Sequence, residues 1–252
     1  MDAEATEPEA ALETGQATDV GRQRRHNEDS LLFLDDARLY AVADGMGGHQ
    51  GGAVASRLAV ETLASAFENR SSRELSNPDK LPPQAFDLVD AIGAANDAIR
   101  TKAMRTVNLA EMGTTLITAW LPHRTRRLFL GHVGDSRCYR LRGGVLEQLT
   151  RDHTVTTLSK TGRFVHRLSR AVGPCRLVEV DVAVLTPQLG DVFLLCSDGL
   201  NKMLPHSEIQ GVLQSPVSAA AHASELVAKA NQAGGVDNVT AIVLHVKPEA
   251  TG

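Results

Sequence analysis

The sequence has few cysteines, few aromatic residues and no long apolar segment. Its three cysteines, Cys138, Cys175 and Cys196, form no C-x-x-C pair, so we expect neither a disulfide framework nor a thiolate zinc site. No stretch approaches the roughly 18 apolar residues of a membrane span. The acidic start of the chain also lacks the apolar core of a secretory signal. These features predict a protein of a reducing, cytoplasmic compartment.

The charge balance gives no general attraction for polyanions. The chain carries 26 basic and 30 acidic residues, a net charge of −4, which favours neither a nucleic acid nor an anionic membrane as partner. An anionic substrate would therefore need positive charge at its binding site, from metal ions or from a few arginines placed there. Aromatic residues make up 4% of the chain, which gives little support for a pocket that stacks on a base.

Length and apolar content favour one large domain. The chain has 252 residues, of which 42% are apolar, enough for a substantial core. Residues 1–14 mix Glu, Ala, Thr and Pro, a composition that predicts a disordered acidic leader. The predicted domain spans residues 15–248, and residues 249–252 form a short tail.

Apolar periodicity predicts an α+β protein. Alternating or continuous apolar runs predict strands at 30–36, 38–45, 175–185, 191–199 and 238–246. Three further short runs, 113–121, 127–135 and 136–144, are interpreted as an antiparallel meander. Helical spacing predicts helices at 53–70, 84–104, 206–214 and 218–235. Strands and helices do not strictly alternate, so we expect a layered sandwich rather than a doubly wound sheet.

Four aspartates stand at predicted strand boundaries, each beside a small or turn residue: Asp44, Asp135, Asp198 and Asp237. Each one alone is consistent with an ordinary turn. If the strand ends meet at one edge of a sandwich, however, the four carboxylates converge and repel one another unless divalent cations neutralise them. Oxygen ligands without a Cys or His set favour Mg²⁺ or Mn²⁺ over zinc. Gly45 would leave a backbone carbonyl accessible as a further ligand.

The segment GRQRRHNEDS places Arg24 and Arg25 shortly before Glu28 and Asp29. It is consistent either with a solvated charge run or with an arginine that binds a phosphate beside metal ions. Cysteine-based phosphate chemistry is excluded because no Cys is followed six positions later by Arg. Three histidines are interpreted as surface or core residues rather than acid catalysts: His49, His132 and His153. Cys196 is interpreted as core packing.

Eight motifs in order resemble the bacterial branch of the PPM family of metal-dependent serine/threonine protein phosphatases. They are GRQRRHNEDS, YAVADGMGGHQGG, MGTTLITAWL, GHVGDSRCYRL, LTRDHT, LSRAVG, LLCSDGL and GGVDNVTAIV. The resemblance spans Thr18 to Val246. It implies a central β-sandwich of two antiparallel sheets flanked by helix pairs. It also implies hydrolysis of phosphoserine and phosphothreonine by a water that two Mn²⁺ or Mg²⁺ ions activate for in-line attack.

The resemblance assigns ligands to these ions. Asp44 matches the carboxylate that bridges two metals, and Gly45 the carbonyl ligand of the second. Asp198 and Asp237 match the remaining direct ligands of the first metal. Asp135, with Asp198, matches the acids that hold a third, weaker metal in bacterial members.

The resemblance also assigns supporting roles. Glu28 and Asp29 match the acids that orient metal-bound waters, Arg24 the phosphate-binding arginine, and Asn238 a residue that supports the site. Met46 stands where many eukaryotic relatives have a proposed general acid, a His, so the donor of the leaving-group proton is unassigned. The flap between DHT and LSRAVG is shorter than is usual in the family.

Two alternative functions remain open at this stage. A catalytically silent domain that binds a phosphoprotein or a kinase would lack a metal acid, whereas Asp44, Asp198 and Asp237 are all present. A hydrolase of small phosphoesters or nucleotides is the second alternative. The expected partners are phosphorylated proteins and a serine/threonine kinase pathway, and the chain is expected to be a monomer.

Overall fold

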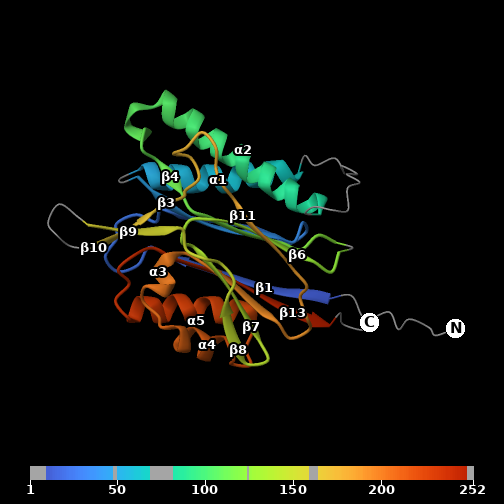
Figure 1. The fold of residues 1–252 in the computed structure, drawn as a ribbon. Coiled ribbons are helices and arrows are strands. Elements are labelled where there is room, and N and C mark those ends of the chain that lie inside the picture. Colours follow the sequence, from blue (N-terminus) through green and yellow to red (C-terminus); the bar gives the residue numbers. More distant parts are fainter. Residues whose placement is uncertain (1–9, 48–49, 69–81, 124, 159–163, 249–252) are drawn as a thin grey trace.

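Two antiparallel β-sheets face each other and are covered on their outer faces by helices, as the computed structural model in Figure 1 shows. The structure describes residues 10–47, 50–68, 82–123, 125–158 and 164–248. The first sheet contains, in spatial order, β11 (Asp181–Leu185), β6 (Leu128–Val133), β5 (Leu116–Trp120), β3 (Leu39–Met46) and β2 (Asp29–Leu34). The second contains β1 (Ala10–Asp19), β13 (Val239–Pro248), β12 (Val192–Cys196), β7 (Arg137–Arg142) and β8 (Val145–Gln148). The α+β sandwich implied by the sequence is confirmed.

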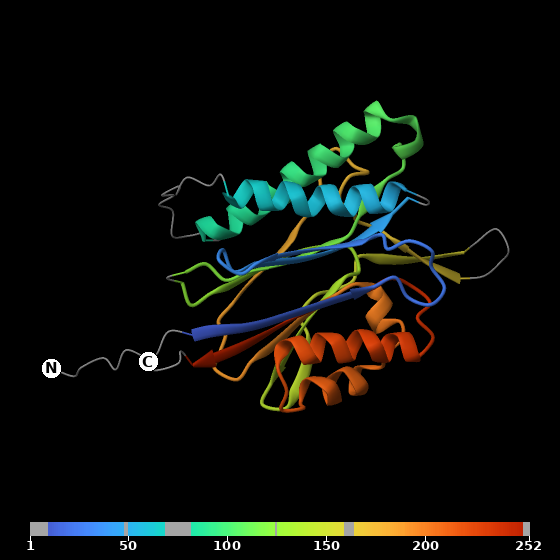
Figure 2. The same cartoon turned by 180° about the vertical axis from the view of Figure 1, so that it is seen from behind.

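Helices form the two outer layers, and the view from behind shows the same four-layer order (Figure 2). The first sheet is covered by α1 (Gly51–Glu68) and α2 (Pro83–Arg105), and the second by α4 (His206–Leu213) and α5 (Ala219–Gln232). The short elements are α3 (Asp198–Asn201), the 3-10 turn Val107–Leu109 and β4 (Gly113–Thr114), which pairs with β3. No helix in the described parts of the chain has the length and apolar character that a membrane crossing requires.

The apolar run of strand β3 is continuous because the strand is buried on both faces. Leu39, Ala41 and Ala43 belong to the core beneath α1 and α2. Tyr40 and Val42 belong to the core between the two sheets. Because a central strand is buried on both faces, alternation of polar and apolar residues is lost. The same strand delivers Asp44 to the end of the sheet.

The middle strands do not form the single antiparallel meander expected from the sequence. Strands β5 and β6 pair in the first sheet, but β7 pairs with β12 and β8 in the second. The chain changes sheets between Val133 and Arg137, where Gly134 has a φ of 111°. This backbone conformation suits glycine and turns the chain across the sandwich edge. Asp135 therefore lies at the crossing between the sheets.

The amino-terminal part of the chain was expected to be disordered through residue 14, and for residues 10–14 that expectation is wrong. They belong to β1, which pairs with β13 over its whole length, from Ala10 opposite Pro248 to Asp19 opposite Val239. Local composition does not reveal this strand because its stability comes from a partner at the other end of the chain. Residues 1–9 and 249–252 lie outside the described residues.

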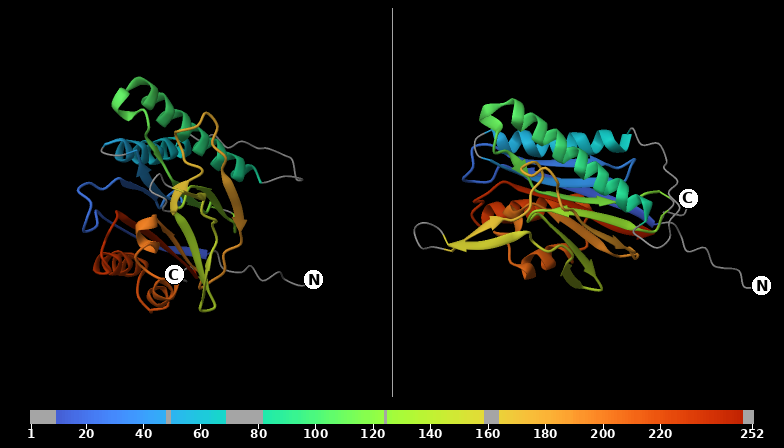
Figure 3. Two further views of the ribbon diagram at one scale, coloured as in Figure 1. Left: turned by 60° about the vertical axis from the view of Figure 1, so that its left-hand side comes forward. Right: turned by 45° about the horizontal axis from the view of Figure 1, so that its top comes forward.

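The flap region forms a two-stranded hairpin apart from both sheets. Strand β9 (Thr154–Leu158) pairs with β10 (Phe164–Leu168), and the right-hand view of Figure 3 shows the hairpin extending from the sandwich. Residues 159–163 lie outside the described residues. Of the predicted strand 175–185, only β11 is a strand.

Candidate metal centre and active site

Asp44 and Asp29 come from neighbouring strands of the first sheet. They stand directly opposite each other in the β2–β3 register. Thr115, which directly precedes β5, holds the backbone of Asp44. The Asp44 N–H donates to Thr115 Oγ1 at 3.0 Å, and the Asp44 carbonyl accepts from Thr115 N at 2.9 Å. Thr115 Oγ1 also lies 2.7 Å from Ser136 Oγ, in the crossing that carries Asp135. These bonds join the strand that ends in Asp44 to the crossing.

Asp198 and Asp237 come from the second sheet. Asp198 begins α3 after β12, and Asp237 lies two residues before Val239, where β13 begins. The two segments pack closely, because a Cβ on Gly199 would lie 1.9 Å from the Asn238 carbonyl oxygen. Strand β12 pairs with β13, so both acids lie at the same end of this sheet.

The carboxylates of the two sheets converge. Burial and the charge of Asp29 raise the pKa of Asp44 well above its ordinary value, and the charges of Asp198, Asp237 and Asp135 act in the same direction. Burial also raises the pKa of Asp29 to about 7, with Asp198 and Asp237 adding to the shift. Burial and Asp198 raise the pKa of Asp135 to about 6. The contacts agree with these shifts, because Ser197, which precedes Asp198, donates to Asp29, and Lys202 pairs with both Asp198 and Asp237.

Glycines near Asp44 allow a close approach of backbone and acid. A Cβ on Gly52 would lie 2.0 Å from Glu28 Oε2 and 2.7 Å from the Gly45 carbonyl oxygen. A Cβ on Gly45 would lie 2.2 Å from the Gly52 carbonyl oxygen. Side chains at these positions would push Glu28 and the start of α1 away from Asp44. The lack of side chains is thus a packing requirement of this edge.

Asn238 holds the segment that precedes β2. Its Oδ1 accepts from Glu28 N at 2.8 Å, and its Nδ2 donates to the carbonyl oxygens of Val20 and His26, each at 2.9 Å. The side chain is 5% exposed. It therefore fixes the loop that carries Arg24 and Glu28 against the start of β13.

Two cations border the acids. Arg24 pairs with Asp237 Oδ1 at 2.8 Å, and its side chain is half exposed. Lys202 pairs with Asp198 Oδ2 and, at 3.2 Å, with Asp237 Oδ2. Burial opposes the charge of Lys202, but Asp198 and Asp237 raise its pKa above the ordinary value. The sequence analysis did not identify Lys202, although its position four residues after Asp198 on a helical turn was the available signal.

The arrangement fits hard divalent cations. Asp29 Oδ1 and Asp198 Oδ1 are buried and accept no hydrogen bond in the part of the chain that the structure describes. Buried carboxylate oxygens without a donor are costly unless a cation or an ordered water satisfies them. The donor set consists of carboxylates and backbone carbonyls, which are the ligands of Mn²⁺ and Mg²⁺.

A second cluster contains two histidines and an acid, of which His153 and Asp181 are joined by a hydrogen bond. One ligand atom each of His132, His153 and Asp181 lies within 4.8 Å of the others. Arg170 already pairs with Asp181 Oδ1 at 2.7 Å, and Gly134 N donates to His153 Nδ1 at 3.1 Å. His153 Nε2 therefore carries the proton that it shares with Asp181 Oδ2 at 3.0 Å. Both histidines are buried. His153 is a hydrogen-bonded core residue, but neither ring nitrogen of His132 has a partner among the described residues, so the expectation of a satisfied core histidine is wrong for His132. His49 lies outside the described residues.

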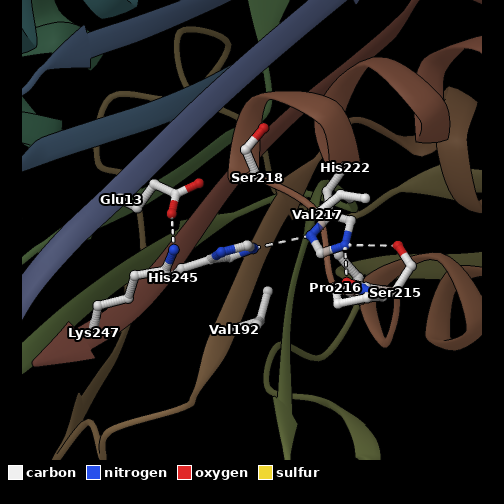
Figure 4. A pocket seen from close by; sticks show the side chains of 10 residues that line it. Glu13, Val192, Ser215, Pro216, Val217, Ser218, His222, His245 and Lys247 are labelled. Carbon is white, nitrogen blue, oxygen red and sulfur yellow. Dashed lines mark hydrogen bonds and ion pairs between the residues drawn. The ribbon is translucent and has the colours of Figure 1, made fainter.

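A cavity of about 460 Å³ is lined by residues of β1, β12 and β13 and of the connection between α4 and α5 (Figure 4). Its lining includes Glu13, Lys247 and the paired rings of His222 and His245, whose Nδ1 and Nε2 atoms are 2.9 Å apart. None of the acids that the sequence analysis assigned to the metal site lines it. The cavity is therefore separate from the candidate metal centre.

Known proteins with the same fold and sequence pattern place the chain in a family. The model of the family described as Protein phosphatase 2C matches residues 20–236. The serine/threonine phosphatase stp of Listeria monocytogenes is 37% identical over 241 residues, which cover 90% of this chain and 93% of that protein. The serine/threonine protein phosphatase PstP of Mycobacterium tuberculosis is 38% identical over 240 residues, which cover 91% of this chain and 44% of PstP.

A solved structure also bears on the metal. The catalytic domain of PstP in complex with two manganese ions has a TM-score of 0.79 and 34% identity, and the match covers 95% of this chain and all of that one. The resemblance drawn from the eight motifs is thus confirmed. The chain belongs to the protein phosphatase 2C family and is a metal-dependent serine/threonine protein phosphatase.

Proposed function

We propose that this phosphatase acts on phosphoserine and phosphothreonine of proteins at the edge where its two sheets meet. The observation that carries the proposal is the convergence of acids from separate parts of the chain: Asp29 stands opposite Asp44, Ser197 beside Asp198 donates to Asp29, and Lys202 pairs with both Asp198 and Asp237. Among the described residues, no donor reaches the buried Oδ1 atoms of Asp29 and Asp198. A silent binding domain has no need of this costly arrangement. The names of the relatives, serine/threonine phosphatases, support the same conclusion.

We carry the metal ligands over from the family resemblance. Asp44, the Gly45 carbonyl, Asp198 and Asp237 would together hold two divalent ions. Asp135 would hold a third ion together with Asp198. When bound, the ions supply an activated water and neutralise the charge of the phosphoryl group.

The remaining residues would orient waters at the metals and bind the phosphate. Glu28 and Asp29 would accept hydrogen bonds from waters at the metals. Arg24 would exchange its ion pair with Asp237 for the nonbridging oxygens of the phosphate, which the planar guanidinium fork matches. Asn238 holds the loop of Arg24 and Glu28 in place. Met46 has no proton to give to the leaving group.

The chemistry of the site also suits a particular biological setting. A serine/threonine kinase pathway would supply the phosphorylated proteins, because a phosphatase of this chemistry requires such substrates. We propose that the chain acts in the cytoplasm as a monomer. Size-exclusion chromatography with light scattering tests the monomer, and a mass corresponding to two chains would contradict it.

The experiment that tests the proposed function measures phosphate release from a phosphothreonine peptide and from nucleotides, with Mn²⁺ or with a chelator. The parent is expected to release phosphate from the peptide only with Mn²⁺, and Asp44→Asn is expected to release almost none. Asp36→Asn changes an exposed acid in the turn between β2 and β3 and serves as the matched control. Release from nucleotides alone favours a small-molecule hydrolase, and no release from either favours a silent domain.

A further inference from the structure

The carboxylate of Asp29 is held by the opposite sheet. Asp29 begins β2 of the first sheet, but its Oδ2 accepts from Ser197 Oγ and from Thr240 Oγ1, each at 2.7 Å. Ser197 follows β12 and Thr240 lies in β13, both in the second sheet, and both residues are 0% exposed. The two hydroxyls thus link the sheets directly at the metal-binding edge.

The protons of this network have one consistent direction. Ser197 Oγ accepts from Thr240 N at 3.0 Å, which leaves its own proton for Asp29. Thr240 Oγ1 gives its proton to Asp29 and must therefore accept from Thr18 Oγ1, 2.8 Å away. Thr18 Oγ1 in turn accepts from Asn27 Nδ2 at 2.9 Å. Every donor points toward Asp29 Oδ2, so the bonds polarise one another in the same sense.

The other carboxylate oxygen of Asp29, Oδ1, lacks the hydrogen bonds that Oδ2 receives from the described residues. Oδ1 is buried, and no donor reaches it within the described part of the chain. A carboxylate with one oxygen held by two hydroxyls has little freedom to rotate, so the position of Oδ1 is also fixed. Simple satisfaction of a buried acid would not require one oxygen to hold both bonds while its twin has none.

We propose that Ser197 and Thr240 are positioning residues that hold the Asp29 carboxylate so that Oδ1 is presented to the divalent ions and their waters. The inference rests on the proposed function of the site. Outer partners that orient the residues around a metal change its affinity by about 10- to 100-fold when removed. Ser197 and Thr240 also join the sheet of Asp44 to the sheet of Asp198, so they set both halves of the site.

The test compares hydroxyl deletions with a matched control. Thr240→Val and Ser197→Ala each remove one donor with little change of volume. Thr240→Ser keeps the donor. Thr118→Val removes another fully buried strand hydroxyl, which bonds to the Gly131 backbone in the first sheet. The measurements are calorimetric titration of the metal-free chain with Mn²⁺, kcat and KM for a phosphothreonine peptide, and the unfolding temperature without metal.

The expected result is Mn²⁺ binding weakened about tenfold or more in Thr240→Val and Ser197→Ala. We expect kcat to fall by a similar factor with KM for the peptide nearly unchanged. Thr240→Ser and Thr118→Val should bind Mn²⁺ like the parent. In the Asp29→Asn background, Thr240→Val should cause no further loss, because Thr240 acts through Asp29.

Two results would overturn the inference and are distinguishable. If the parent binds Mn²⁺ and both deletions bind it equally well, with only the unfolding temperature lowered, the hydroxyls are structural and this inference alone fails. If the parent binds no Mn²⁺, the proposed function and the inference fail together. Should Thr240→Val not fold, Ser197→Ala decides the question by the same measurements.

Discussion

Asp29 and Asp44 stand opposite each other at the ends of β2 and β3, two partly buried acids in one register pair. Like charges at directly opposed positions of antiparallel strands destabilise the sheet. Here the charge of Asp29 adds to burial in raising the pKa of Asp44. The metal-binding edge therefore costs folding stability in the metal-free protein, and divalent ions recover that cost by binding only the folded state.

The first prediction separates the activity of Asp44 from its effect on stability. Asp44→Asn should lower metal-dependent phosphate release by about a thousandfold, because metal ions supply several kcal/mol of transition-state stabilisation. The same change removes repulsion among five carboxylates, so the metal-free variant should unfold at a higher temperature than the metal-free parent. Calorimetric unfolding in a chelator measures this, with Asp36→Asn as control. A lower unfolding temperature for Asp44→Asn would contradict the repulsion.

The second prediction concerns Lys202, whose ammonium pairs with both Asp198 and Asp237. Lys202→Met removes this cation, so the metal-free chain should become less stable. Mn²⁺ should bind more tightly, because Lys202 no longer competes for the two acids and only Arg24 still pairs with Asp237. Titration with Mn²⁺ and unfolding in a chelator measure the two effects.

Lys229→Met is the matched control for Lys202. Lys229 pairs with Glu208 and Glu225 on the surface of α5, away from the acids of the metal site. The Lys229→Met substitution should change neither the affinity for Mn²⁺ nor the stability of the metal-free chain appreciably, since exposed ion pairs contribute little to stability. Weaker Mn²⁺ binding in Lys202→Met would show that Lys202 supports the metal instead.

The third prediction is a pH dependence from His132. Burial and the neighbouring His153 lower the pKa of His132 to about 4, and neither ring nitrogen has a hydrogen-bond partner among the described residues. The unfolded chain, with a pKa near 6.5 for this residue, binds the proton more readily than the folded chain. Neutral His132 therefore costs the folded protein no stability above about pH 6.5. As the pH falls toward 4, the free energy of unfolding decreases by about 3 kcal/mol in total, because the unfolded chain takes up the proton first.

His132→Phe should reduce this loss. Denaturant unfolding at several pH values from about 7 to 4 measures the difference in unfolding free energy between variant and parent, which should move in favour of the variant as the pH falls. His123→Phe changes an exposed ring that lies 2.8 Å from the Asp36 carbonyl oxygen, and should leave the pH dependence unchanged. An equal pH dependence in His132→Phe and the parent would refute the assignment.

The strands and helices that the sequence predicts are those whose pattern is local. The run from Leu39 to Ala43 is apolar because both faces are buried, and α1 follows as expected. Strand β1 was missed because its residues carry no apolar alternation and are ordered by β13. The meander was wrong because strand spacing does not indicate which sheet a strand joins, and the chain changes sheets near Gly134.

In the candidate site too, residues with a local sequence pattern could be predicted, and residues whose role depends on distant partners could not. The sequence predicts Asp44, Asp198 and Asp237 as metal ligands because acids beside apolar runs mark strand ends. It does not predict Ser197 and Thr240, because their roles depend on Asp29, 168 and 211 positions away in the sequence.

The account rests on divalent ions bound between the acids of the two sheets. Anomalous diffraction at the manganese edge, from crystals grown with Mn²⁺, tests it most directly. The account predicts at least two manganese peaks bounded by Asp44, Asp198 and Asp237, lost in crystals of Asp44→Asn. Manganese peaks only elsewhere, for example beside His132 and Asp181, with none among the three acids, would contradict it.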